Sequence, residues 1–168
     1  MAVLALAEAG AALGRPEWVA AADATADLLL ERHVVDGRVR RSSRGGTVGA
    51  AAGVLEDHAC LAEALLALHQ ATGAAHRLQQ AVQVLELTLA HFADPVVAGA
   101  FFDTADDAEA LLHRPREITD NATPSGAAAL AGALLTASVL VDDPQRYRDT
   151  AEAALRTAGS LARRFPRF

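Results

Sequence analysis

The feature that most constrains the fold is a helix pair that recurs three times along the chain. The segments GRPEWVAAADATADLLL, AAHRLQQAVQVLELTLA and DDPQRYRDTAEAALRTA each begin with a turn and place a large residue early in an amphipathic helix. These large residues, Trp18, Leu78 and Tyr147, lie 60 and 69 residues apart, well beyond the period of about 34 residues of tetratricopeptide repeats. Because each segment follows a more apolar helix, the sequence predicts three consecutive helical hairpins.

Apolar residues at helical spacing predict six helices. Gly14 and Gly73 are typical residues for the end of a helix, whereas Pro16 and Pro144 are typical of a first turn. We expect Thr123 to be a candidate cap for the fifth helix. The predicted ranges are 2–13, 16–32, 55–73, 75–92, 125–141 and 144–165.

The connection between the second and third helices contains a β-hairpin signal. Asp36-Gly37 lies between short β-branched runs, and a two-residue turn of this type needs positive φ angles. The following stretch, 42–53, is rich in serine and glycine, which indicates a mobile loop.

Small side chains dominate the apolar content: hydrophobic residues make up 52% of the chain but aromatic residues only 4%. This composition favours closely packed helices over sheets. Two helices and a long variable loop per unit are typical of an (α/α) toroid, so we predict an all-α fold of three toroid hairpins with a small inserted β-hairpin. Burial of apolar surface stabilises by about 25 cal/mol per Å², so the open edge should drive self-association or packing on the missing half of the barrel.

Charge and motif content exclude several classes of protein. The net charge is −6 and lysine is absent, which disfavours nucleic-acid partners and anionic membrane surfaces. The single cysteine, Cys60, excludes an internal disulfide and a cysteine-based zinc cluster. No apolar run reaches the roughly 20 residues of a membrane helix and no signal peptide is recognisable, so we expect a cytoplasmic protein without a membrane partner. No phosphate-binding loop, nucleophile elbow or metal-spaced histidine cluster is present, so no cofactor and no metal are predicted.

Two neighbouring residues at the start of the third helix are catalytic candidates, Asp57 and His58. Carboxylates in a first turn also cap free N–H groups and suit the helix dipole, so a structural role for Glu56 and Asp57 is about as well supported as a functional one. His58 shares a face with Leu61 and Leu65, and a histidine on an apolar face is more often a core residue than a catalyst.

The segment 101–126, FFDTADDAEALLHRPREITDNATPSG, concentrates polar and aromatic residues in a long connection between helices. Such a connection inside a compact domain is functional or disordered, and its apolar content favours the first. Asp103 is a further catalytic candidate. The residues Phe102, Arg114, Glu117, Asp120 and Asn121 are substrate-binding candidates together with Glu56. The structural alternative is a hydrophobic plug and an ion-pair network that order the loop.

Four stretches in this order resemble one family: DGRVRRS (36–42), GVLEDHACLAEALLALHQATG (53–73), GAFFDTADD (99–107) and RPREITDNATPSG (114–126). They are similar to the C-terminal helical region of the YyaL-type, spermatogenesis-associated, thioredoxin-domain-containing proteins. The chain departs from the family pattern at His58, where a tyrosine is usual, and at Ala127, where asparagine is usual.

The resemblance implies a fold and a class of function. In this family a thioredoxin-like domain precedes an (α/α)6 barrel of the six-hairpin glycosidase type, related to N-acylglucosamine 2-epimerases. Residues 1–168 would then be a single partial barrel domain, the C-terminal part of a longer protein, without the thioredoxin-like domain. The leading hypothesis is a carbohydrate-related pocket for a small sugar, acting as an epimerase, isomerase or glycoside hydrolase. The alternative is a non-catalytic scaffold or binding module that packs against a thioredoxin-like domain or a protein partner.

Overall fold

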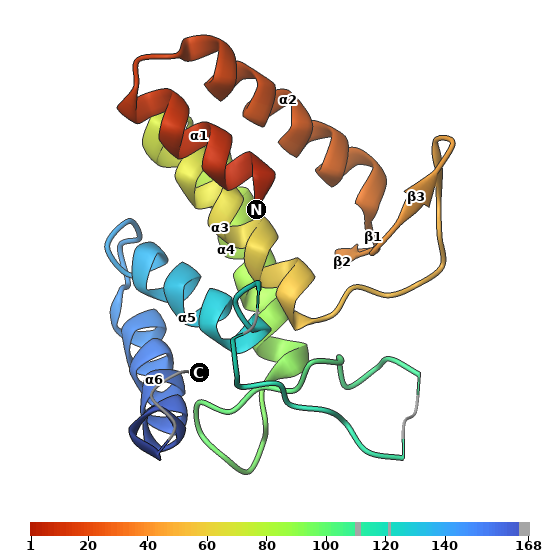
Figure 1. Ribbon diagram of the computed structural model, residues 1–168, viewed down its shortest axis with the longest axis vertical. Helices are drawn as coiled ribbons and strands as arrows, with labels where there is room; N and C mark the ends of the chain where they lie inside the picture. Colours follow the sequence, from red (N-terminus) through yellow and green to blue (C-terminus); the bar gives the residue numbers. More distant parts are fainter. Residues whose placement is uncertain (110–111, 121, 165–168) are drawn as a thin grey trace.

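The computed structural model describes residues 1–109, 112–120 and 122–164, with side chains described for all of these except 160–162 and 164. Six helices form three consecutive hairpins (Figure 1), which confirms the predicted helix pairs and the all-α class. The described residues form no closed barrel. The helices are α1 (Ala2–Ala12), α2 (Pro16–His33), α3 (Leu55–Thr72), α4 (Ala75–Phe92), α5 (Gly126–Ala137) and α6 (Gln145–Arg164).

The hairpins are arranged in two layers. Helix α3 packs against α1 on one side and against α5 on the other, and α2, α4 and α6 each pack against the first helix of their own hairpin. Figure 1 shows the α3–α4 hairpin in the middle of the molecule. Helix α3 carries buried residues on most of its surface, because it has neighbours on several sides. They include Leu55, Leu61, Leu65, Leu66 and Leu68.

Glycine sets the distance between α3 and α5. A Cβ atom on Gly126, the first residue of α5, would lie 2.8 Å from the backbone nitrogen of Glu56 and 2.9 Å from Cγ of Leu55. Only a residue without a side chain allows this approach. The N-terminal ends of α3 and α5 therefore lie next to each other.

Polar contacts connect the second helices of successive hairpins. The buried Arg77 of α4 bonds two carboxylates of α2: its Nε lies 2.8 Å from Oδ1 of Asp23, and its Nη2 lies 2.7 Å from Oδ1 of Asp27. In the same way the Tyr147 hydroxyl of α6 donates to Glu86 of α4 at 2.7 Å. Arg77 is the third residue of α4 and Tyr147 the third of α6. The large residue of the middle hairpin that corresponds to Tyr147 is therefore Arg77 and not Leu78.

The α2–α3 connection holds two short β-hairpins. The predicted one is confirmed: β1 (Val34–Val35) pairs with β2 (Arg38–Val39) around Asp36-Gly37, whose φ angles are 51° and 74°. The prediction of a loop over 42–53 is wrong in part. Strands β3 (Ser43–Arg44) and β4 (Thr47–Val48) form a second antiparallel pair around two glycines with positive φ.

The start of α5 differs slightly from the expectation. Ser125, and not Thr123, caps the helix, because its hydroxyl oxygen accepts the N–H of Ala128 at 3.2 Å. The helix ends at Ala137, four residues before the predicted end at 141. The segment 93–125 leads from α4 to this cap and runs past the N-terminal end of α3, where Asp103 accepts the N–H of Leu55.

Candidate functional site

A polar cleft of about 280 Å³ lies at the adjacent N-terminal ends of α3 and α5. We call it the α3/α5 cleft. Three of the predicted site residues, Glu56, Asp103 and Glu117, line it together, although they are far apart in the sequence. The other lining residues are Arg41, Val54, Thr119, Thr123, Pro124, Ser125 and Gly126.

Asp103 joins three parts of the cleft wall. Its carbonyl oxygen accepts the N–H of Leu55 at 2.9 Å, and its own N–H donates to the Pro115 carbonyl at 2.9 Å. Its carboxylate oxygen Oδ2 accepts the N–H of Glu117 at 2.9 Å. Partial burial raises the pKa of Asp103, and the nearby charge of Glu117 acts in the same direction. Asp103 is therefore easier to protonate than an ordinary aspartate.

The pKa of Glu117 moves in the opposite direction. Its Oε1 accepts hydrogen bonds from the hydroxyl and the backbone N–H of Thr119. These bonds, the hydroxyl bond first, lower the pKa of Glu117. Two carboxyl groups in one cleft whose pKa values move apart can divide the roles of acid and base between them.

Arg41 is a residue of the cleft that the sequence analysis did not single out as a site residue. It follows β2, and its Nε lies 3.0 Å from Oδ2 of Asp57. The available signal was its position within the stretch 36–42, which carries part of the family resemblance. Arg41 adds the only guanidinium among the residues that line the α3/α5 cleft.

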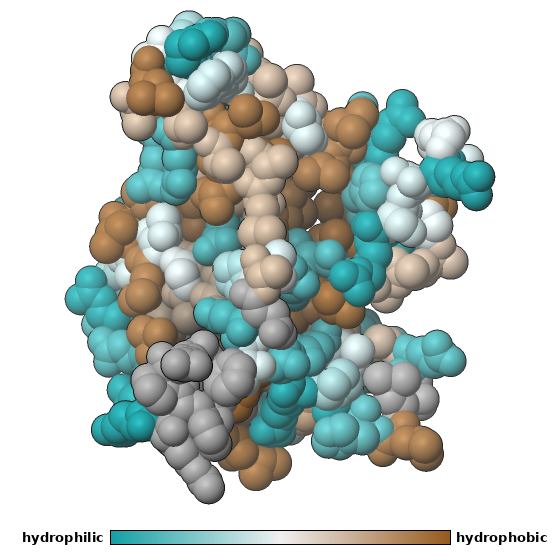
Figure 2. Space-filling view, viewed as in Figure 1, coloured by the Kyte–Doolittle hydropathy of each residue, from teal (hydrophilic) through white to brown (hydrophobic). Residues whose placement is uncertain are grey.

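Asp57 faces a different cavity from its neighbour Glu56. Its Oδ2 accepts the N–H of Val54 at 2.8 Å, so it caps α3. Asp57 lines a second cavity of about 220 Å³ with Met1, Val3, Leu29, His33, Val39, Arg40, Arg41, Cys60, Leu61 and Ala64. In Figure 2 the surface is hollowed and largely brown between the N-terminal end of α1 and the strands.

His58 lies in the core, outside the α3/α5 cleft, with 1% of its surface exposed. Its Nε2 accepts the N–H of Val39 at 3.3 Å, so the proton of the neutral ring is on Nδ1, 3.0 Å from the Val54 carbonyl oxygen. The ring centroid lies 4.9 Å from that of Phe92. The two ring nitrogens therefore connect α3 to Val39 of β2 and to Val54, the residue just before the helix.

A pH dependence of stability follows from His58. Burial lowers its pKa below the ordinary 6.5, so as the pH falls through that value the unfolded chain takes up a proton that the folded chain does not. The stabilisation is complete above this pH and decreases below it. We expect the free energy of unfolding, measured with urea, to fall between pH 7.5 and 5.5.

The matched variant is His58→Gln. It should be less stable than the parent protein at pH 7.5, and its stability should change less over the same pH range. A variant with the same pH slope as the parent protein would show that another group is responsible.

Phe102 and Arg114 contact each other and do not line the α3/α5 cleft. The Cζ atoms of Arg114 and Arg116 lie 4.0 Å and 4.2 Å from the Phe102 ring centroid. Arg114 donates to the carbonyl oxygens of Thr104 and His91, and Arg116 forms an ion pair with the buried carboxylate of Asp94. The contacts of these two guanidiniums therefore hold the residues around Phe102 against the C-terminal end of α4.

Asp120 has a structural contact beside the cleft, since its Oδ1 accepts the N–H of Ser125 at 2.8 Å. It lines a groove of about 340 Å³ between the segment 99–120 and the α5–α6 hairpin. Asn121 lies outside the described residues.

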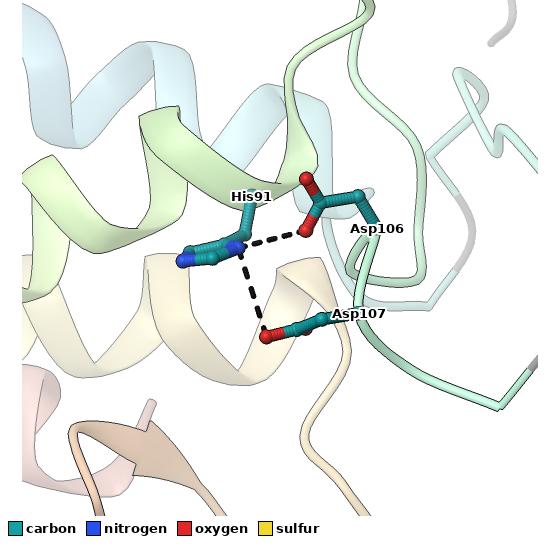
Figure 3. A group of neighbouring side chains, drawn as sticks. All are labelled: His91, Asp106 and Asp107. Atoms are coloured by element: carbon teal, nitrogen blue, oxygen red, sulfur yellow. Dashed lines mark hydrogen bonds and ion pairs between the residues drawn. The ribbon is translucent and has the colours of Figure 1, made fainter.

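One group of side chains has the spacing of a metal site. His91 at the end of α4 and Asp106 and Asp107 in the following segment offer ligand atoms within 4.8 Å of one another (Figure 3). Nδ1 of His91 lies 2.7 Å from Oδ1 of Asp106, and Asp107 forms an ion pair with Arg38 of β2. These contacts account for the cluster as an anchor of the segment, and we assign no metal to it.

No helix in the described part of the chain is both long enough and apolar enough to cross a membrane.

Comparison with known proteins adds one relative. No protein-family model matches the chain. Over 143 residues the chain is 33% identical to spermatogenesis-associated protein 20 of Mus musculus. This similarity supports the family resemblance. The matched region covers 79% of the chain but 18% of the mouse protein, so the match spans less than a fifth of the length of this relative.

Proposed function

We propose that this chain forms part of an (α/α) barrel in a protein of the spermatogenesis-associated, thioredoxin-domain-containing family, and that the α3/α5 cleft binds a carbohydrate. The observation that carries the proposal is the convergence of Glu56, Asp103 and Glu117 with Arg41 in one cleft. Carboxylates and a guanidinium are suitable partners for the hydroxyl groups of a sugar, because together they accept and donate hydrogen bonds.

The packing of the helices is compatible with the barrel. The first helices of the three hairpins lie side by side and the second helices cover them, the arrangement of inner and outer helices in a toroid. In such a barrel the site would be at the ends of inner helices, where the α3/α5 cleft lies.

The two carboxyl groups suggest an acid/base reaction. Epimerisation and glycoside hydrolysis both need a pair of titratable groups near the reacting centre. Asp103, whose pKa is raised, suits the acid, and Glu117, whose pKa is lowered, suits the base. The N–H of Glu117 donates to Asp103, so the two residues are held together.

The experiment is a binding titration followed by amide chemical shifts, with neutral, amino and acidic monosaccharides. We expect at least one sugar to shift the amide signals of Thr119 and Gly126. In Asp103→Asn these shifts should be lost or need at least tenfold more sugar, about 1.4 kcal/mol of binding free energy. The control is Glu31→Gln, an exposed carboxylate on α2, which should bind as the parent protein does.

A non-catalytic scaffold is the second candidate, and a specific observation favours it. The carboxylates of Asp57, Asp103 and Asp120 each accept a backbone N–H and so have a structural contact: Asp57 caps α3, Asp103 holds the backbone of Glu117, and Asp120 bonds the N–H of Ser125 at the start of α5. If no sugar binds and Asp103→Asn only lowers the melting temperature, the structural role is sufficient and the carbohydrate proposal is wrong.

A further inference from the structure

Two cavities of the protein meet at one side chain, that of Arg41. It lines the polar α3/α5 cleft of about 280 Å³ and also the second cavity of about 220 Å³, which we call the α2/α3 cavity. Nε of Arg41 lies 3.0 Å from Oδ2 of Asp57, which lines the α2/α3 cavity, whereas the preceding residue, Glu56, lines the cleft. The side chains of this ion pair are 49% and 24% exposed, so the boundary between the two cavities is a solvent-exposed ion pair and not part of the packed core.

The α2/α3 cavity is built mainly from the segment 29–64, which supplies nine of its eleven lining residues. Three large apolar side chains of this segment line it, those of Leu29, Val39 and Leu61. An apolar cavity of about 150 Å³ is large enough to bind benzene. The α2/α3 cavity, at about 220 Å³, therefore has room for a six-membered ring or a short alkyl chain.

The polar side chains around the α2/α3 cavity already have partners within the protein. The ring nitrogens Nδ1 and Nε2 of His33 lie 2.8 Å from the Arg40 carbonyl oxygen and 3.1 Å from the Ser43 hydroxyl. Nη1 of Arg40 donates to the Ala50 carbonyl oxygen at 2.9 Å, and Asp57 caps α3. These groups need no polar ligand to satisfy them, so the cavity favours an apolar occupant, which gains from the burial of its surface.

The carboxylates of the α3/α5 cleft, in contrast, have acceptor atoms left over. Among the described residues, none forms a hydrogen bond or ion pair with the Glu56 carboxylate, and Asp103 uses only Oδ2 to accept the N–H of Glu117. Carboxylate oxygens without a donor suit the hydroxyl groups of a ligand. The cleft and the cavity beside it therefore favour opposite kinds of chemical group.

We propose that the α3/α5 cleft and the α2/α3 cavity are two parts of one binding site, and that its ligand is a sugar linked to a small apolar group, such as an aryl or short alkyl glycoside. The inference rests on the proposed function, since it places the sugar ring in the cleft. The apolar group occupies the α2/α3 cavity beside Leu29 and Leu61. Arg41 lies where the two parts meet, and because exposed ion pairs contribute little to stability, its guanidinium can turn from Asp57 toward the sugar.

Matched pairs of glycosides test the proposal. The probes are the methyl and phenyl glycosides of glucose, galactose and mannose, as α and β anomers, titrated into the full chain and followed by amide chemical shifts. We expect at least one phenyl glycoside to bind at least tenfold more tightly than the methyl glycoside of the same sugar and anomer. Both should shift the amide signals of Thr119 and Gly126, and only the phenyl glycoside those of Cys60 and Leu61.

A cavity-filling variant locates the apolar group. Leu29→Trp places a larger side chain at the wall of the α2/α3 cavity and should remove the advantage of the phenyl glycoside over the methyl glycoside. The matched control is Leu28→Trp, because Leu28 is 48% exposed on the same helix and does not line the cavity. This control should bind both glycosides as the parent protein does, and circular dichroism melts of both variants should show that the helices are retained.

The opposing results separate this inference from the function on which it rests. Methyl and phenyl glycosides of equal affinity overturn the inference and leave the carbohydrate proposal in place. A phenyl advantage that persists in Leu29→Trp also overturns it, since the apolar group would then lie elsewhere. If no glycoside shifts the signals of Thr119 and Gly126, the proposed function itself is wrong, and the inference with it.

Discussion

Replacing Phe92 with alanine should destabilise the fold by about 3–5 kcal/mol, the usual cost of removing a fully buried phenylalanine. Phe92 is the last residue of α4 and is completely buried. Its ring packs on His58, and its carbonyl oxygen accepts the N–H of Phe102 at 2.8 Å. The substitution leaves a cavity where α3, α4 and the segment that carries Asp103 meet.

The measurement is the free energy of unfolding from urea denaturation at pH 7.5. A domain of this size has a total stability of about 5–15 kcal/mol, so the variant could be largely unfolded at 37 °C. Leu28→Ala is the control, because Leu28 is 48% exposed on α2 and such substitutions change stability by about 0.5 kcal/mol or less. A loss below about 1 kcal/mol for Phe92→Ala would contradict the burial described for its ring.

Replacing Gly99 with alanine should lower the free energy of unfolding by an amount similar to that for Phe92→Ala, because the added methyl group would overlap with backbone atoms. Gly99 has a φ of 77°, and a Cβ atom there would lie 2.3 Å from the carbonyl carbon of Ala153 and 2.5 Å from the nitrogen of Ala154. Those atoms belong to the backbone of α6 and cannot rotate away. We expect a loss of about 3 kcal/mol or more, since strain of about 1–3 kcal/mol from the positive φ adds to the overlap.

Gly73→Ala separates the two causes. Gly73 has a similar φ of 72°, and nothing lies within 4 Å of the position of an added Cβ. Thermal and urea unfolding of both variants should therefore show a clearly smaller loss for Gly73→Ala, at about 1 kcal/mol. Equal losses would mean that the segment around Gly99 moves away from α6 without cost.

The helices and the first β-hairpin could be predicted because their signals are local. Apolar periodicity marks a helix in any context, and Asp36-Gly37 has the positive φ angles that its turn requires. The anchor Arg77 could not be recognised in this way. A buried arginine becomes plausible only when its partners, Asp23 and Asp27, are known to lie beside it, and they belong to an earlier hairpin.

The candidate site was predicted in part for a related reason. Consecutive residues in a helix point about 100° apart, as follows from 3.6 residues per turn. Glu56 therefore faces the α3/α5 cleft, Asp57 turns to Arg41 and His58 enters the core. A cluster of three polar residues in the sequence is not one cluster in space.

The approach of Asp103 and Glu117 to Glu56 depends on backbone contacts that have no sequence pattern. The N–H of Leu55 donates to Asp103, and the N–H of Glu117 donates to its carboxylate. The second strand pair, β3 and β4, was missed because serine and glycine are typical of loops, whereas here the two glycines supply the positive φ angles of a tight turn.

The central place of the α3–α4 hairpin has a consequence for how the chain acquires its structure. The first and last hairpins each pack mainly on this hairpin, so neither can bury its apolar face until α3 is in place. Each terminal hairpin therefore depends on an ordered α3 for a stable partner. A repeat is stabilised by its nearest neighbours. A destabilising substitution in α3 should therefore destabilise both terminal hairpins, whereas one in α1 or α6 should mainly destabilise its own hairpin. Random substitution should thus be tolerated more readily toward the two ends of the fold than at its middle.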